Sequence, residues 1–147
     1  MLIGNYTAKM DEKGRLKIPA DFKRYLEETY QSTEFYVTSA KGDSVWIYPM
    51  KVWQEKLEKM NLAPSEEPAI KKFAQRVSYY GQRQEIDAQG RILIHPLLRN
   101  TAKLVGEVMV IGQSKFLEVW EAEDFRARME ADPYTDDDAR IVAQHGI

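Results

Sequence analysis

Two aspartates with nearly identical surroundings are the residues of this sequence best placed to do chemistry. DEKGR occupies residues 11–15, and DAQGR occupies residues 87–91. Paired carboxylates can share one proton and act in hydrolysis, and D-x-x-G is also found in enzymes that bind nucleotides. The arginine that ends each stretch suggests a third chemistry, because a guanidinium can contact phosphates or the edges of guanine bases.

Neither hydrolytic chemistry fits the surrounding sequence. A proton-sharing pair of carboxylates must be buried together in a cleft, whereas Asp11 and Asp87 stand in polar turns. A nucleotide-hydrolysing site would need a G-x-x-x-x-G-K-[ST] loop, which the sequence lacks. The two histidines, His95 and His145, have neither metal-ligand spacing nor an obvious nucleophile beside them. The sequence therefore predicts a protein that is not an enzyme, with no metal and no cofactor.

The aspartate and the glycine of each stretch are expected to build a turn. Asp accepts hydrogen bonds from backbone N–H groups two residues on, and Gly adopts a positive φ without steric cost. A type I turn closed by a left-handed glycine is a common hairpin connection. We therefore assign structural, turn-forming roles to Asp11, Gly14, Asp87 and Gly90.

Alternating side chains on both sides of the first turn predict a β-hairpin. YTAKM (6–10) alternates in the period of two that a half-buried strand requires. In RLKIP (15–19), Leu16 and Ile18 face one way while Arg15 and Lys17 face the other. Pro19 is expected to end this strand and to start a helix over residues 20–30.

The sequence contains this unit twice. An offset of 76 residues aligns the two turns and their return strands, and an offset of 72 then aligns FYVT (35–38) with EVMV (107–110). At that second offset Tyr48 falls on Trp120 and Trp53 falls on Phe125. The second copy is therefore predicted to have four residues fewer in its middle.

Four segments follow from the duplication. The first repeat spans 1–56, a helical connector spans 57–76, the second repeat spans 77–125, and a C-terminal helix with an acidic tail spans 126–147. Ser65 is a plausible N-cap for a connecting helix that ends near residue 79. Because two short hairpin units cannot each enclose a core, we expect them to interleave in one barrel with a pseudo-two-fold axis.

Composition bounds the cellular setting. The chain has 147 residues, 44% hydrophobic and 30% charged, which is typical of a globular protein. It has no cysteine, no signal-peptide pattern and no apolar run long enough to span a membrane, so a cytoplasmic protein is expected. The net charge of −2 argues against a simple basic nucleic-acid binder, but residues 1–24 hold six cations against three anions.

The doubled D-x-x-G-R motif, followed each time by an apolar strand pair and a helix with an aromatic anchor, resembles the MraZ family of bacterial transcriptional regulators. The resemblance implies an α+β fold, a double swapped-hairpin (AbrB-like) β barrel decorated by helices. It also implies a ring-shaped homo-oligomer, associated with the nucleoid. The resemblance further implies that this ring binds short direct DNA repeats in the promoter of the division and cell-wall gene cluster. The family commonly has a proline at the position of His95 and an arginine at that of Lys23.

Arg15 has two possible roles. It can pair with Asp11 across its own turn, although an exposed ion pair contributes only about 0–1 kcal/mol to stability. Alternatively, it belongs to a cationic strand face that contacts DNA. Given the resemblance, the predicted DNA-binding residues are Lys9, Lys13, Arg15, Lys17 and Arg91. The second copy has Gln89 where the first has Lys13, and Leu93 where the first has Lys17, so its contact with DNA stays open.

A second function remains possible. A single protomer neutralises few phosphates and binds weakly, and a ring would multiply that affinity. The alternative is an AbrB-like oligomeric module that binds protein partners without specific DNA recognition. The aromatic residues are expected in the core or between subunits, and they are Trp46, Tyr48, Trp53, Trp120 and Phe125.

Overall fold

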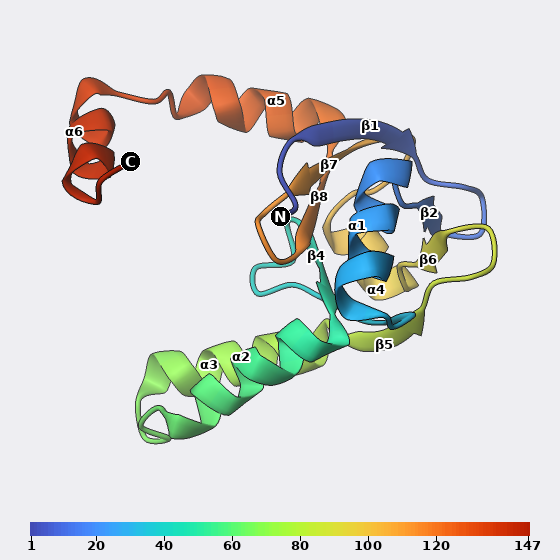
Figure 1. Ribbon diagram of the computed structural model, residues 1–147, viewed down its shortest axis with the longest axis horizontal. Helices are drawn as coiled ribbons and strands as arrows, with labels where there is room; N and C mark the ends of the chain where they lie inside the picture. The colour runs from blue at the N-terminus through green and yellow to red at the C-terminus, as the bar shows by residue number, and fades with distance from the viewer.

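The computed structural model describes residues 1–147, which form eight strands and six helices in an α+β arrangement (Figure 1). The strands are β1 (Asn5–Lys9), β2 (Arg15–Lys17), β3 (Glu34–Thr38), β4 (Val45–Pro49), β5 (Gln82–Glu85), β6 (Arg91–Leu93), β7 (Glu107–Gly112) and β8 (Leu117–Glu121). The helices are α1 (Ala20–Tyr30), α2 (Met50–Leu62), α3 (Pro68–Tyr79), α4 (Pro96–Thr101), α5 (Ala122–Ala131) and α6 (Asp136–Gln144). No helix is both long enough and apolar enough to cross a membrane.

The strands form two antiparallel sheets. One has six strands in the order β1-β7-β8-β4-β3-β5, and the other is a two-stranded ribbon of β2 and β6. Strands β1 and β5 are the edges of the larger sheet and do not pair with each other. Hydrogen bonding therefore does not close the sheet into the expected barrel.

The two repeats are interleaved strand by strand. Strand β1 of the first repeat pairs with β7 of the second, β5 pairs with β3, and β2 pairs with β6. The expected hairpin between residues 6–10 and 15–19 is therefore wrong. The turn forms, but next to it only a single bridge joins the two segments, between Met10 and Leu16. The physical reason is burial, since pairing β2 with β6 places Leu16 opposite Ile92, both fully buried.

An approximate two-fold axis passes through the ribbon between Leu16 and Ile92. The hydrogen bonds beyond the ribbon follow this symmetry, because Ile18 N donates to Gly90 O and Ile94 N donates to Gly14 O, both at 2.9 Å. Strands β4 and β8 pair symmetrically as well, with Trp46 opposite Glu118 at the centre. Each turn is thus hydrogen-bonded to the return strand of the other repeat.

The alignment of the third strand is one residue out of step with the structure. In β3, Phe35 and Val37 are buried, whereas in β7 the buried residues are Val108 and Val110. The strand pairing supports the same shift. Tyr36 lies opposite Arg83 and Met109 lies opposite Thr7. Because Thr7 and Arg83 are equivalent at the offset of 76, Tyr36 and Met109 are equivalent as well. FYVT therefore matches VMVI (108–111) at an offset of 73. The second repeat is three residues shorter before β7, and the fourth missing residue is in the turn before β8.

Two apolar clusters hold the molecule together. The larger one joins the six-stranded sheet to the ribbon and to α1 and α4, with Phe22 and Leu98 buried from those helices. The smaller one lies beneath α2 and α3, which run side by side in Figure 1. In it Trp53 stacks on Tyr36 with ring centroids 4.6 Å apart. Two predicted core aromatics, Tyr48 and Trp53, are buried there.

Helix boundaries mostly follow local signals. Helix α1 starts directly after Pro19 and ends at Tyr30, and the next residue, Gln31, adopts the left-handed conformation. The predicted N-cap at Ser65 is wrong, because α3 begins at Pro68 after Glu67 and has no side-chain cap. Proline suits that first position since its missing N–H would be unpaired there anyway. Residues 57 and 76, proposed as the ends of a connector, lie within α2 and α3.

Candidate nucleic-acid interface

Each D-x-x-G-R stretch folds into the same hydrogen-bonded turn. In the first, Asp11 Oδ1 accepts hydrogen bonds from the backbone N–H groups of Lys13 (3.0 Å) and Arg15 (2.8 Å). Asp11 Oδ2 accepts from the side-chain Nε of Arg15 at 2.8 Å. These bonds, above all the backbone one from Arg15, lower the pKa of Asp11. The aspartate therefore remains ionised and holds both the turn and its arginine.

The second turn repeats this geometry with the same atoms. Asp87 Oδ1 accepts from the backbone N–H groups of Gln89 and Arg91, both at 2.9 Å. The Nε of Arg91 donates to Asp87 Oδ2 at 2.8 Å, and the backbone bond from Arg91 is the main cause of a lowered pKa for Asp87. In both turns, the ion pair that the sequence offered as an alternative role for the arginine is formed through Nε alone, so the two Nη nitrogens remain for another partner.

Both turn glycines need to be glycine for conformational and packing reasons. Gly14 and Gly90 each have a φ of +79°. A Cβ on Gly14 would lie 2.4 Å from Cζ of Arg99, and a Cβ on Gly90 would lie 3.1 Å from Cδ of Lys23. Each turn is therefore covered by a cationic side chain from the helix that follows the other turn.

Lys23 and Arg99 are the residues of this region that motif reasoning missed. The two residues are 76 positions apart, which is the offset between the two turns, so the alignment of the repeats could have identified them as equivalent. Lys23 pairs with Glu27 at 2.7 Å, whereas the Nε of Arg99 is buried and has no hydrogen-bond partner.

The ribbon has one buried and one outward face. Leu16 and Ile92 point into the core, so the outward face consists of Arg15, Lys17, Arg91 and Leu93. Lys17 lies directly opposite Arg91, and Arg15 lies opposite Leu93. Like charges directly opposite each other in an antiparallel pair destabilise it. We call these four residues the ribbon face.

The other two predicted cations lie beside the ribbon face. Lys13 is exposed in the first turn and makes no ion pair. Lys9 belongs to β1 in the larger sheet, opposite Glu107, whose carboxylate is bound by Arg126 at 3.0 Å. Figure 1 shows the β1–β2 and β5–β6 turns projecting at the same end of the molecule. The structure thus brings Lys13, Arg15, Lys17 and Arg91 to one end, with Lys9 on a neighbouring strand.

His95 has a structural environment. Its ring is buried, and Nε2 lies 2.7 Å from the carbonyl oxygen of Tyr80. No group of three or more His, Cys, Asp or Glu side chains is arranged to hold a metal ion.

Comparison with known proteins gives matches along nearly the whole chain. The family described as "MraZ protein, putative antitoxin-like" matches residues 1–76 and 81–144. A transcriptional regulator MraZ from Acidobacterium capsulatum is 45% identical over 147 residues, which is 100% of both chains. One from Koribacter versatilis is 42% identical over the same full lengths. One from Corynebacterium kroppenstedtii is 36% identical over 145 residues, 97% of this chain and 98% of the relative.

Proposed function

This chain belongs to the MraZ family, and we propose that it regulates transcription by binding double-stranded DNA through the ribbon face. Its relatives are named as transcriptional regulators, a class of protein that is not an enzyme. We further propose that the bound sites are short direct repeats in the promoter of the division and cell-wall gene cluster. This role predicts association with the nucleoid.

The single observation that supports DNA binding most strongly is the pairing of Lys17 with Arg91 across the ribbon. Two adjacent cations repel each other, and only Arg91 has an ion-pair partner, in Asp87. A phosphate bound between them would replace repulsion by two attractive contacts. The ribbon face is therefore most stable when an anion covers it.

The arginines of the ribbon face are held ready for such a contact. In each of them Nε is fixed by a turn aspartate at 2.8 Å, while the side chain is about a third exposed, 30% for Arg15 and 27% for Arg91. Fixing a side chain before binding lowers the entropy lost on binding. The free Nη nitrogens can reach phosphate oxygens or the O6 and N7 atoms of guanine, and a two-stranded ribbon fits the major groove.

Assembly compensates for the small number of cations in one protomer. A net charge of −2 and a few phosphate contacts give weak, salt-sensitive binding. A ring-shaped homo-oligomer would present several ribbon faces at once, which raises overall affinity without new contacts. Sites spaced by about ten base pairs, one helical turn, would meet neighbouring faces on one side of the DNA.

The test of specific binding is selection from a random double-stranded DNA pool at roughly physiological salt. The proposal expects enrichment of a short box repeated at about ten-base-pair spacing. If folded, oligomeric protein enriches no sequence, the alternative function, an oligomeric module that binds protein partners, replaces it.

Substitution of Arg15 tests the ribbon face itself. Arg15→Ala is expected to weaken binding by about 1–3 kcal/mol per contact, roughly 5- to 150-fold, with the fold retained. Fluorescence anisotropy with a labelled site measures the loss. Arg76→Ala, an exposed arginine on α3, is the matched control and should bind as the wild type does. Equal affinity of the two variants would exclude the ribbon face as the DNA contact.

A further inference from the structure

The C-terminal segment of residues 133–147 extends away from the rest of the molecule. We call it the arm, and it contains α6 (Figure 1). All its hydrogen bonds and its one ion pair lie within the segment itself, including the capping box between Thr135 and Asp138 and the pair between Arg140 and Asp137. No such interaction joins it to the body.

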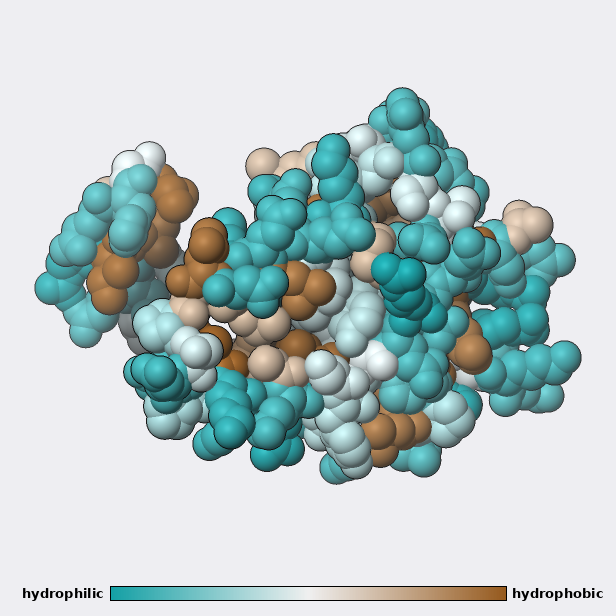
Figure 2. Space-filling model, turned by 90° about the horizontal axis from the view of Figure 1, so that it is seen from below, coloured by the Kyte–Doolittle hydropathy of each residue, from teal (hydrophilic) through white to brown (hydrophobic).

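A helix in this situation needs a partner. Helix α6 has nine residues, and isolated helices shorter than about 12–15 residues are marginal in water. The apolar side chains of the arm are largely uncovered, with Ile141 in the helix 55% exposed and Tyr134 just before it 70% exposed. The apolar band of the detached helix is visible at the upper left of Figure 2. The arm therefore has an apolar face that nothing in its own chain covers.

The charge of the arm indicates the chemistry of that partner. Its first helical turn consists of Asp136, Asp137 and Asp138, and Arg140 is its only Lys or Arg. Asp136 makes no ion pair, and Asp138 is engaged in the cap. A matching surface must combine apolar area with cations.

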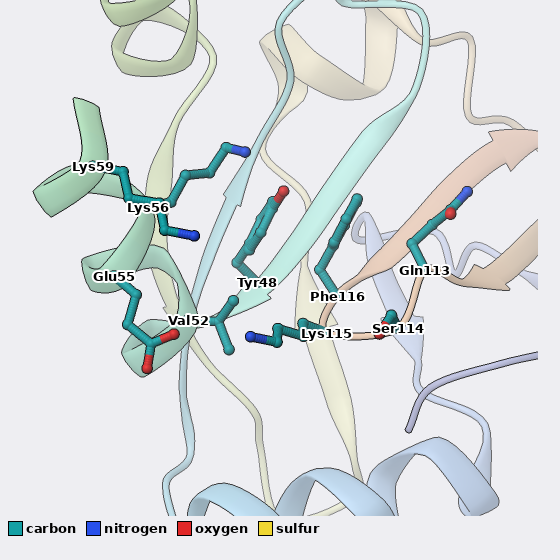
Figure 3. A pocket seen from close by; sticks show the side chains of 9 residues that line it. All are labelled: Tyr48, Val52, Glu55, Lys56, Lys59, Gln113, Ser114, Lys115 and Phe116. Carbon is teal, nitrogen blue, oxygen red and sulfur yellow. The ribbon is translucent and has the colours of Figure 1, made fainter. Parts of the chain in front are cut away.

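A surface of this kind lies between α2, β4 and the β7–β8 turn. This groove, which we call the lysine groove, has a volume of about 290 Å³ and is lined by Tyr48, Val52, Lys56, Lys59, Lys115 and Phe116, with Glu55 at its margin. Its floor is a stacked pair of rings, Tyr48 and Phe116, with centroids 4.3 Å apart. The three lysines extend around these rings in Figure 3, and none forms an ion pair within the chain.

We propose that the arm of one copy binds in the lysine groove of the next copy. Ile141 and its apolar neighbours would pack on the Tyr48 and Phe116 rings, and Asp136 and Asp137 would face the lysines. The contact is head-to-tail because arm and groove are different surfaces, and a repeated head-to-tail contact closes into a ring when its rotation allows. This inference rests on the ring assembly proposed above and names the surfaces that form it.

Charge exchange tests the contact. Three reversals in the groove, Lys56→Glu, Lys59→Glu and Lys115→Glu, or two in the arm, Asp136→Lys and Asp137→Lys, should each abolish assembly at concentrations where the wild type is assembled. Sedimentation should then show the 17.1 kDa protomer. A one-to-one mixture of the two variants should assemble again, because each arm then meets a groove of opposite charge.

Matched substitutions outside both surfaces serve as controls. Lys51→Glu on α2 and Glu28→Lys on α1, both exposed, should leave the mass of the assembly unchanged. Wild-type mass in the groove or arm variants overturns the proposal, as does failure of two folded variants to assemble on mixing. A monomeric wild type overturns ring assembly itself, whereas loss of DNA binding in an intact ring concerns the ribbon face alone.

A cross-linking experiment avoids any change of charge at the interface. The chain has no cysteine, so Ile141→Cys in one copy and Ser114→Cys, at an exposed position that lines the groove, in another can be joined specifically by a short bis-maleimide. Cross-linked dimers from a mixture of the two single variants support the proposal. Their absence, or a cross-link only within one chain that carries both cysteines, contradicts it.

Discussion

Arg15 and Arg91 each give one nitrogen to a turn aspartate and keep two for a partner outside the chain. The aspartates have a second role, because their ionised side chains also accept the backbone N–H groups of the turn. Their lowered pKa values therefore connect the stability of the fold to the geometry of the ribbon face.

Acid should weaken the fold through these two carboxylates. Their folded-state pKa lies below the unfolded value of about 3.9, so they stabilise the fold above pH ~4 and lose this effect as pH falls through the folded-state pKa. The double variant Asp11→Asn, Asp87→Asn should be less stable than the wild type at pH 7, and the difference should shrink towards pH 2. Urea unfolding across this range measures it.

The control for this titration is Asp132→Asn, an exposed carboxylate with no ion-pair partner. It should unfold like the wild type at every pH. A difference between the double variant and the wild type that is constant with pH would show that the carboxylate charge is not what stabilises the turns.

At the scale of elements, each turn packs against a side chain from the helix that follows the other turn.

Because Arg99 packs on the first turn, Gly14→Ala should be more destabilising than Gly106→Ala. Both glycines have a φ of +79°, so both substitutions carry strain of about 1–2 kcal/mol. Only a Cβ at residue 14 would also collide with Arg99, because nothing lies within 4 Å of a Cβ at Gly106. Thermal unfolding of the two variants gives the comparison, and equal melting temperatures would show that Arg99 moves aside freely.

Local sequence patterns predicted the elements well and their partners poorly. The alternation in RLKIP identified β2, but periodicity says which face of a strand is buried and not which strand it pairs with. Strand β2 pairs with β6 rather than β1 because Leu16 packs opposite Ile92 in the core, and Ile92 is 76 residues away from Leu16 in the sequence. The one-residue error in aligning β3 with β7 also arose from using sequence alone. Residue similarity favoured matching FYVT with EVMV, whereas the pattern of buried residues matches it with VMVI.

The candidate site was predictable to the extent that it lies within the repeated motif. Lys13, Arg15, Lys17 and Arg91 come from that motif, and the structure brings them to one end of the molecule. The contribution of Arg99 was not predictable from the motif, because it arises from packing between the two repeats.

At the scale of the whole molecule, the ribbon face and the arm lie at opposite ends (Figure 1). An acidic segment close to the cations of the ribbon would compete with phosphate for them. The distance between the two ends would allow one chain to use acidic residues for the proposed assembly and basic residues for the proposed DNA contact.

The imperfect symmetry of the ribbon would give the proposed DNA contact a direction along the duplex. Rotation by 180° about the axis between Leu16 and Ile92 exchanges Lys17 with Leu93, so a bound site has a distinguishable head and tail. Protomers arranged head-to-tail would all present the ribbon face in the same orientation around a ring. In a DNA site with two repeated boxes, inverting one box should therefore weaken binding, because Lys17 of that protomer would no longer lie at the phosphate it contacts. Leu93→Lys should make the face nearly palindromic, so that gel-shift titrations no longer distinguish the inverted arrangement from the original one.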